Sequence, residues 1–208
     1  MKLFGNIFSP KGHTIHKSIA EGNIQEISTY LKSPNHTNSD FDPESILHYA
    51  IDNCKNNYDE TIEFLISYCD DINSHHSKYM DTPLHKICER VKPNMHLIRV
   101  FLEKGADVNA KNISGKTPIF SCFHSFSSEL ISLLSEYGAD LNMKDKYGNT
   151  VLHDDYLFSD SNKFEAFLET LIKLGFNINA RNSAGYTPRG FCKSKIFDEI
   201  FEKHGGIR

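Results

Sequence analysis

Histidine and cysteine are the residues of this sequence that could support metal or nucleophilic chemistry, and the chain contains 11 histidines and 5 cysteines. Metal and catalytic centres need such residues at characteristic spacings, for example H-E-x-x-H on one helix. That spacing does not occur here. His75 and His76 are adjacent in a predicted turn, and His153 precedes Asp154 and Asp155 on a predicted helix, where consecutive residues do not face each other. The sequence therefore predicts no metal site and no catalytic histidine.

The cysteines give the same answer. They are odd in number, scattered, and contain no C-x-x-C pair, which argues against a zinc site or a disulfide framework and favours a reducing cytoplasm: Cys54, Cys69, Cys88, Cys122 and Cys192. Cys88 and Cys122 fall in or beside positions for small residues on predicted helices, so packing is the expected role. No phosphate loop, dinucleotide fingerprint or nucleophile elbow is present. We therefore expect a protein that is not an enzyme and that needs no cofactor.

Composition narrows the class of partner. The 208 residues carry a net charge of −4 with a pI near 6.2, whereas a general nucleic-acid binder is expected to be basic. No apolar run approaches the ~18 residues of a membrane span, and residues 1–8 are too short and interrupted for a secretory signal. Abundant Asn, Ile and Lys suggest an AT-rich genome, as in many intracellular bacteria, large viruses and some parasites. We predict a cytoplasmic protein, in the host cytoplasm if it is a secreted effector or a viral protein, with no nucleic-acid partner and no membrane span.

The elements that position these residues repeat along the chain. A short phrase that begins with Thr-Pro opens successive units; one copy has Ser-Ile and another Thr-Val in place of Thr-Pro. The copies are Ser45-Ile46-Leu47-His48, Thr82-Pro83-Leu84-His85, Thr117-Pro118-Ile119-Phe120, Thr150-Val151-Leu152-His153 and Thr187-Pro188. Their starting positions are 37, 35, 33 and 37 residues apart. Repetition at this period indicates a stack of small structural units.

A second phrase keeps step with the first. Its copies are Asp70-Asp71-Ile72-Asn73, Gly105-Ala106-Asp107-Val108-Asn109, Gly138-Ala139-Asp140-Leu141-Asn142 and Gly175-Phe176-Asn177-Ile178-Asn179. Between the phrases lies a turn and then a helix start. Thr117 is predicted to cap a helix through its hydroxyl, Pro118 suits the first helical position, and Gly115 allows the tight turn before them.

With two phrases in register over several copies, residues 13–204 resemble the ankyrin-repeat family, whose unit is about 33 residues with a T-P-L-H-x-A signature. The resemblance implies an all-α solenoid of about six helix-turn-helix units with β-turn fingers and capping units at both ends. After a leader, 1–12, a single domain would comprise units near 13–44, 45–76, 77–111, 112–144, 145–181 and 182–204. Inner helices are expected near 14–20, 45–53, 83–90, 118–124 and 151–158. Outer helices are expected near 24–32, 58–68, 94–104, 128–137, 163–174 and 195–204.

The resemblance also assigns roles to residues. His48, His85 and His153 hold the histidine position of the signature, where this side chain hydrogen-bonds the Thr and the turn backbone. The structural motif is then Thr82, His85, Thr117, Thr150, His153 and Thr187. The family often binds partners through the finger tips and the exposed ends of inner helices. By position, the predicted contact residues are Lys78, Tyr79, Glu89, Arg90, Ile113, Lys116, His124, Lys146, Tyr147, Phe158 and Tyr186. Met80 replaces the turn glycine and is expected to distort its finger.

Two functions from different classes remain open. The first is a non-catalytic protein-protein interaction module, monomeric alone, that binds a protein on its concave face as an adaptor, an inhibitor or a pathogen factor acting on a host protein. The second is a receptor for a small ligand such as a nucleotide, bound by a basic strip on the fingers: Lys78, Lys111, Lys116, Lys144 and Lys146. A third hypothesis is modification, because Asn109, Asn142 and Asn179 match the position at which ankyrin asparagines are hydroxylated in animal cells.

Overall fold

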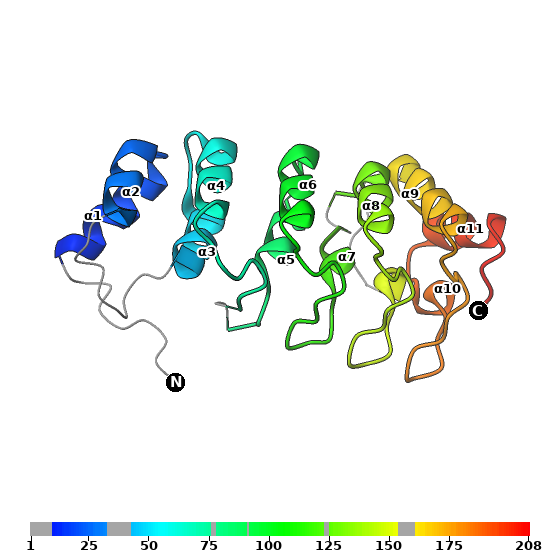
Figure 1. The fold of residues 1–208 in the computed structure, drawn as a ribbon. Helices are drawn as coiled ribbons and strands as arrows, with labels where there is room; N and C mark the ends of the chain where they lie inside the picture. Colours follow the sequence, from blue (N-terminus) through cyan, green and yellow to red (C-terminus); the bar gives the residue numbers. More distant parts are fainter. Residues whose placement is uncertain (1–9, 33–42, 76–77, 91, 123–124, 154–160) are drawn as a thin grey trace.

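The chain folds into a row of paired helices, as the computed structural model in Figure 1 shows. The structure describes residues 10–32, 43–75, 78–90, 92–122, 125–153 and 161–208. One layer contains α2 (Ile24–Leu31), α4 (Tyr58–Ile66), α6 (Met95–Glu103), α8 (Ser128–Glu136), α9 (Ser161–Lys173) and α11 (Lys195–Lys203). The other contains α1 (Pro10–Ala20), α3 (Pro43–Asn53), α5 (Pro83–Cys88), α7 (Pro118–Ser121), the 3₁₀ turn η2 (Val151–His153) and α10 (Pro188–Phe191).

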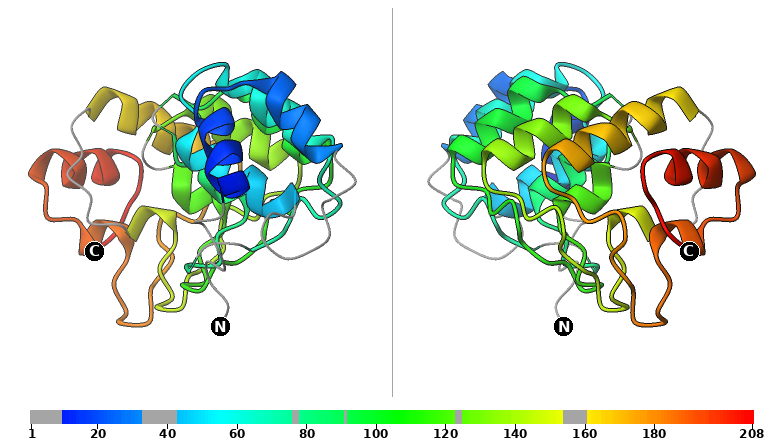
Figure 2. Two further views of the ribbon diagram at one scale, coloured as in Figure 1. Left: turned by 90° about the vertical axis from the view of Figure 1, so that its left-hand side faces the viewer. Right: turned by 90° about the vertical axis from the view of Figure 1, so that its right-hand side faces the viewer.

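Each unit stacks on the next, so the protein is an all-α repeat solenoid. Contacts run between successive outer helices, from α4 to α6, α8, α9 and α11, and between inner helices such as α5 and α7. Paired turns, the fingers, project beyond the inner helices on one side of the stack (Figures 1 and 2). The shape follows from sequence, because each helix pair has an apolar face that only a neighbouring unit can bury.

The outer helices show how this burial arises. In α6, Leu97, Ile98 and Phe101 are fully buried because the 3.6-residue period places them on one face. Removing an aliphatic or aromatic side chain of this size from water contributes about 2–3 kcal/mol. Asn94 begins the helix, since its Oδ1 accepts a hydrogen bond from Leu97 N at 3.2 Å. A matching cap begins α8, where Ser127 Oγ accepts from Leu130 N at 3.1 Å.

A ladder of asparagine side chains joins the units at the ends of the outer helices. Asn73, Asn109, Asn142 and Asn179 repeat one arrangement. Each Nδ2 donates to the carbonyl of a glycine one unit further on, Gly105, Gly138, Gly175 or Gly205, at 2.9–3.2 Å. Each Oδ1 accepts from a backbone N–H of the same next unit, that of Asp107, Asp140, Asn177 or Ile207, at 2.7–2.9 Å. The amide thus satisfies one backbone C=O and one backbone N–H in the turn that follows each outer helix.

Several local expectations need correction. Thr117 occupies the cap position, but its hydroxyl makes no cap bond, because the N–H of Phe120 already donates to the Thr117 carbonyl at 2.9 Å. Ser45 lies inside α3, which begins at Pro43, where a missing N–H costs nothing. For the same reason α1 begins at Pro10, within the predicted leader. Residues 151–153 form a 3₁₀ turn, and the rest of that predicted helix lies outside the described residues.

Candidate protein-binding surface

The fingers form one continuous surface because each hydrogen-bonds the next. Within three of them, a tight turn closes with a backbone bond of 2.9 Å, from Asn112 N to Lys116 O, from Asp145 N to Asn149 O and from Asn182 N to Tyr186 O. Between fingers, the bonds run from Ile113 N to Tyr79 O, from Lys146 N to Ser114 O and from Ser183 N to Tyr147 O, at 2.9–3.0 Å. Adjacent fingers therefore keep a fixed register.

Side chains inside each turn hold its shape. Asn112 Oδ1 accepts from the N–H groups of Ser114 and Lys116, at 2.9 and 3.1 Å. Asp145 Oδ1 does the same for Tyr147 and Asn149, at 2.8 and 2.9 Å. These bonds within two of the turns restrict the backbone of the tips before any partner binds.

Apolar side chains point away from this scaffold. Tyr79, Ile113, Tyr147 and Tyr186 are 53%, 57%, 61% and 54% exposed. The Lys78 ammonium lies 4.7 Å from the centre of the Tyr79 ring, and that of Lys146 lies 5.1 Å from the Tyr147 ring. We refer to Tyr79, Ile113, Tyr147 and Tyr186 as the fingertip row. The fingers thus present large apolar groups, two of them beside a cation, that the core of the solenoid does not use.

The remaining predicted contact residues divide into three groups. Lys116 is half-buried, its ammonium 5.7 Å from the Phe120 ring centre. Glu89 and Arg90 are exposed beyond α5, but the Arg90 guanidinium already stacks 4.0 Å from the Tyr58 ring. Burial raises the pKa of Tyr58 to about 12, and the nearby Arg90 charge partly offsets that rise. His124 and Phe158 lie outside the described residues.

The threonine–histidine pairs tie each inner helix to the next finger. His85 Nδ1 accepts from the Thr82 N–H at 3.2 Å and lies 2.9 Å from Thr82 Oγ1, while its Nε2 lies 3.0 Å from the Lys116 carbonyl. Since Nδ1 is an acceptor, the proton is assigned to Nε2 and the ring is neutral. Thr150 and His153 repeat this arrangement with the Tyr186 carbonyl, at 3.1, 2.9 and 2.9 Å. Burial lowers the pKa of both histidines.

The other two threonines behave differently. Thr187 Oγ1 accepts from Gly190 N at 3.0 Å and donates to the Ile207 carbonyl. Thr117 has Phe120 in place of histidine, and its buried Oγ1 has no hydrogen-bond partner among the described residues. Thr117 is therefore the one motif threonine in the described part of the chain whose hydroxyl is buried without a bond.

One charged cluster was not predicted from the sequence. Glu165 and Glu169 of α9 and His204 after α11 offer three ligand atoms within 4.8 Å of one another. The Lys203 ammonium, however, already lies 2.6 Å from Glu165 Oε1, and His204 Nε2 lies 3.0 Å from the same oxygen. Hydrogen bonds from Lys203 and His204 lower the pKa of Glu165. Glu165 thus joins α9 to the end of α11 through an ion pair with Lys203 and a contact with His204. Glu165 and His204 are 39 residues apart, so no local sequence pattern predicts their contact.

The repeat region of this chain is similar in sequence to known ankyrin-repeat proteins. Residues 47–145 match the family model described as ankyrin repeats (3 copies). The chain is 34% identical, over 93 residues, to the ankyrin repeat protein OPG189 of Variola virus (isolate Human/India/Ind3/1967), and equally to the protein of that name from Variola virus. The aligned region covers 44% of this chain and 16% of each relative, so the chain spans a small part of their length. Within the described residues, no helix combines the length and apolar character that crossing a membrane requires.

Proposed function

Because this chain is an ankyrin-repeat protein resembling those of a poxvirus, we propose that it binds a partner protein through its fingers and inner-helix ends. Ankyrin repeats generally serve as protein-interaction modules and are typically non-catalytic. The partner would lie along the fingers, with Tyr147 and Tyr79 as its main anchors, since aromatic side chains dominate the energetics of most interfaces.

The fingertip row is the observation that supports this proposal. Its four side chains are each more than half exposed. Ile113, Tyr147 and Tyr186 belong to fingers closed by a backbone bond, and the Tyr79 carbonyl accepts a bond from the next finger. A rigid apolar surface loses little conformational entropy on binding, so its contacts translate efficiently into affinity. Isolated exposed apolar residues are common, but Tyr79, Ile113 and Tyr147 lie at the tips of three consecutive fingers, and Tyr186 lies in the next finger, just before its cap threonine.

The similarity to viral proteins bears on where the protein acts and on which class of partner it binds. We propose that the protein is a pathogen factor that acts in the host cytoplasm on a host protein, as a single repeat domain over residues 13–204. On this proposal the chain carries no catalytic residue, and the threonine–histidine pairs serve the fold alone.

Site-specific photocrosslinking tests the surface directly. A benzoylphenylalanine replaces Tyr147 on a finger or, as the matched control, Leu174, an apolar residue 40% exposed at the end of α9. After irradiation in host cells, position 147 should yield a discrete adduct and position 174 should not. Tyr147→Ala should then reduce co-purification of the identified protein roughly tenfold or more, as for a central anchor. Equal adducts from both positions, or adducts from 174 alone, would place the interface elsewhere.

The receptor alternative has its own readout. A nucleotide that binds the folded state raises the melting temperature, and the rise grows with the logarithm of the nucleotide concentration above its Kd. On our proposal, thermal-shift measurements with nucleoside mono-, di- and triphosphates should show no change. A rise that disappears in the variant Lys146→Gln would favour the small-ligand reading instead.

A further inference from the structure

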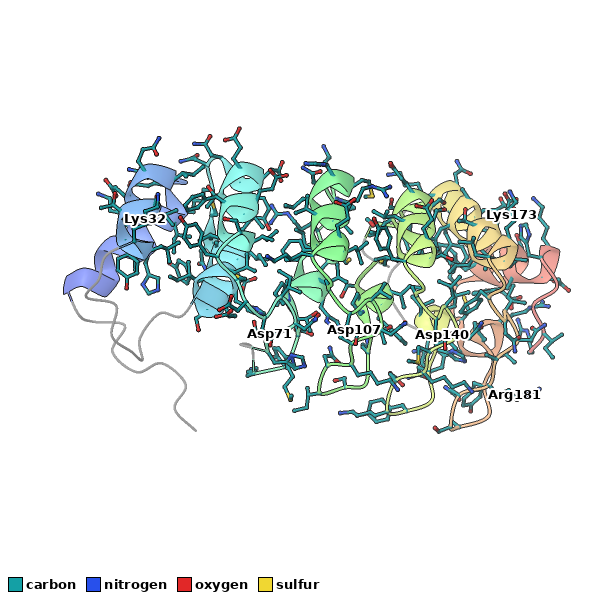
Figure 3. All side chains as sticks on the ribbon, viewed as in Figure 1. Lys32, Asp71, Asp107, Asp140, Lys173 and Arg181 are labelled. Carbon is teal, nitrogen blue, oxygen red and sulfur yellow. The ribbon has the colours of Figure 1, made fainter. Side chains whose placement is uncertain are left out.

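A second feature of the fingers lies on the chain segment that enters each finger after a ladder asparagine. Lys111, Lys144 and Arg181 each follow a ladder asparagine by two residues, so they occupy the same position in three consecutive fingers. All three are exposed. We call them the cationic column. Only Lys111 and Lys144 belong to the basic strip predicted from the sequence. Arg181 was missed, although its spacing from Asn179 identifies it. In Figure 3, Arg181 lies among the fingers, whereas Asp107 and Asp140 lie closer to the helices.

The column keeps its positive charge. Within the described parts of the chain, none of its three side chains forms an ion pair. Lys144 Nζ donates to the Arg181 carbonyl at 2.9 Å, and Arg181 Nη1 donates to the Gly185 carbonyl at 2.6 Å. These neutral acceptors hold the two side chains against the fingers without cancelling their charge.

The aspartates on the same chain segments accept hydrogen bonds from backbone N–H groups. Asp107 Oδ1 accepts from Asn109 N and Asp140 Oδ1 accepts from Asn142 N, each at 2.9 Å. Asp145 is buried and holds its own turn. The surface there carries both signs of charge, but Lys111, Lys144 and Arg181 are the exposed cationic groups that recur at one position of successive fingers. Each can pair with an anionic group of a ligand.

The spacing of the column follows from the hydrogen bonding. Each finger contributes two chain segments, and backbone bonds join segments both within a finger and between fingers. Hydrogen-bonded segments lie about 4.7–4.9 Å apart, so equivalent residues of successive fingers should repeat every ~9.5 Å. Helices of stacked units pack about 8–10 Å apart, which gives the same repeat independently.

An extended peptide matches this repeat at every third residue. A polyproline II segment rises about 3.1 Å per residue with three residues per turn, so residues i, i+3 and i+6 lie on one face, about 9.3 Å apart. We propose that the protein partner supplies an extended segment that crosses the fingers, with an Asp or Glu at every third position paired to Lys111, Lys144 and Arg181. This inference rests on the proposed function and specifies the chemistry of the partner.

Synthetic peptides test the spacing. One 12-residue fluorescein-labelled peptide carries Glu at every third position in a Pro/Ala frame, and a second has the same composition with the Glu residues at spacings of two and four. Fluorescence anisotropy at low ionic strength should show the first peptide binding about tenfold more tightly, because each exposed ion pair in register contributes about threefold. Added salt should weaken it, since exposed pairs are screened. Equal binding of the two peptides, or none at millimolar concentration, would overturn the inference.

Charge variants locate the binding. Lys144→Glu and Arg181→Glu should each weaken the period-three peptide about tenfold, and the milder Lys144→Gln about threefold. Lys55→Glu, in the exposed loop between α3 and α4, makes the same charge change away from the fingers and should leave binding unchanged. Circular dichroism checks that each variant is folded. Equal weakening by Lys55→Glu would mean that the peptide responds to net charge alone, against the inference.

Two further experiments distinguish a failure of this inference from a failure of the proposed function. A 12-mer of oligo(dT) should bind more weakly than the period-three peptide, and tighter binding would assign the column to nucleic acid instead. The photocrosslink from position 147 should be lost when Lys144→Glu and Arg181→Glu are combined. If that crosslink persists in full, the proposed interaction surface stands and the inferred acidic segment is wrong.

Discussion

Two neighbouring units of the solenoid depart from the repeat in opposite places. The unit with α5 and α6 has a complete Thr82–His85 pair bonded to the next finger, but its own finger contains Met80 at φ +56°. The unit with α7 and α8 has a relaxed finger, with Gly115 at φ +74°. Its cap is incomplete, because Phe120 replaces the histidine and Thr117 Oγ1 is left without a partner.

The difference shows which parts of a unit can vary. A left-handed conformation at a residue with a side chain costs roughly 1–2 kcal/mol, and an unsatisfied buried hydroxyl costs about 1–3 kcal/mol. Each unit carries one of these defects and not both. Since a repeat protein is stabilised by terms from each unit and each interface, a single defect is tolerated while the neighbouring stack and the asparagine ladder remain intact.

The largest loss of stability is expected when the unit of α5 and α6 also loses its histidine, as the unit of α7 and α8 has. His85→Phe leaves the Thr82 hydroxyl and N–H without their acceptor, and the Lys116 carbonyl loses one donor. The free energy of unfolding should fall by about 3 kcal/mol in urea denaturation. The double variant Thr82→Val with His85→Phe should recover about 1 kcal/mol, because it removes the unpaired hydroxyl. A double variant that is simply less stable again would contradict this account of the pair.

Lowering the pH should weaken the same threonine–histidine pairs reversibly and reduce the free energy of unfolding by a smaller amount. Burial lowers the pKa of His85 and His153 below their usual value of 6.5, so the unfolded chain binds more protons than the folded one just below that pH. The contribution of the pairs is fully present above pH 6.5 and declines as the pH falls from 6.5 towards the lowered pKa values. Urea denaturation at pH 7.5 and 5.5 should show this loss, and it should be smaller in His85→Phe. An identical pH dependence in both proteins would contradict the assignment.

Replacing Met80 in the finger of the α5–α6 unit by glycine should increase the stability of the protein. Met80→Gly removes the cost of a left-handed residue with a side chain and should stabilise the protein by about 1 kcal/mol. The matched control is Gly148→Ala in a finger that has its glycine, where a Cβ would lie 2.6 Å from Ser183 Oγ and 2.7 Å from Ser183 N. That control should lose stability. Both changes are measured as shifts in the urea midpoint, and a loss in Met80→Gly would show that the Met80 side chain stabilises the finger.

Much of this architecture could be predicted from the sequence. The two phrases recur in register, and the asparagine, glycine and histidine positions of the units follow from that register alone. The all-α repeat solenoid is confirmed, because periodic apolar residues leave one way to bury the helix faces. The exposure of Tyr79, Ile113 and Tyr147 follows for the same reason, since the repeat gives their positions no role in the core. Their role in binding a partner remains a prediction.

Other features depended on contacts that sequence does not reveal. The cap role of Thr117 was wrong because a backbone bond from Phe120 had already taken the amide. Arg90 carries a charge at a suitable position, but its stacking on Tyr58 joins residues of two different units. The link from Glu165 to His204 likewise needs the three-dimensional packing of α9 on α11. Local patterns predict elements well, whereas competition between alternative partners is decided only in the folded stack.

The smallest expected effect lies in the second unit. Thr117→Val replaces a buried, unpaired hydroxyl by a methyl group of similar size, and Thr117 already has the extended backbone that valine favours, with φ −99° and ψ 168°. Because no hydrogen bond is lost, the free energy of unfolding should stay the same or rise by up to about 1 kcal/mol. Thr82→Val, the same change in the complete pair, should lower it by about 1 kcal/mol, since Thr82 Oγ1 lies 2.9 Å from His85 Nδ1. The two threonines are followed three positions further on by His85 in one unit and Phe120 in the other. Equal losses would therefore mean that the histidine does not decide the role of the threonine.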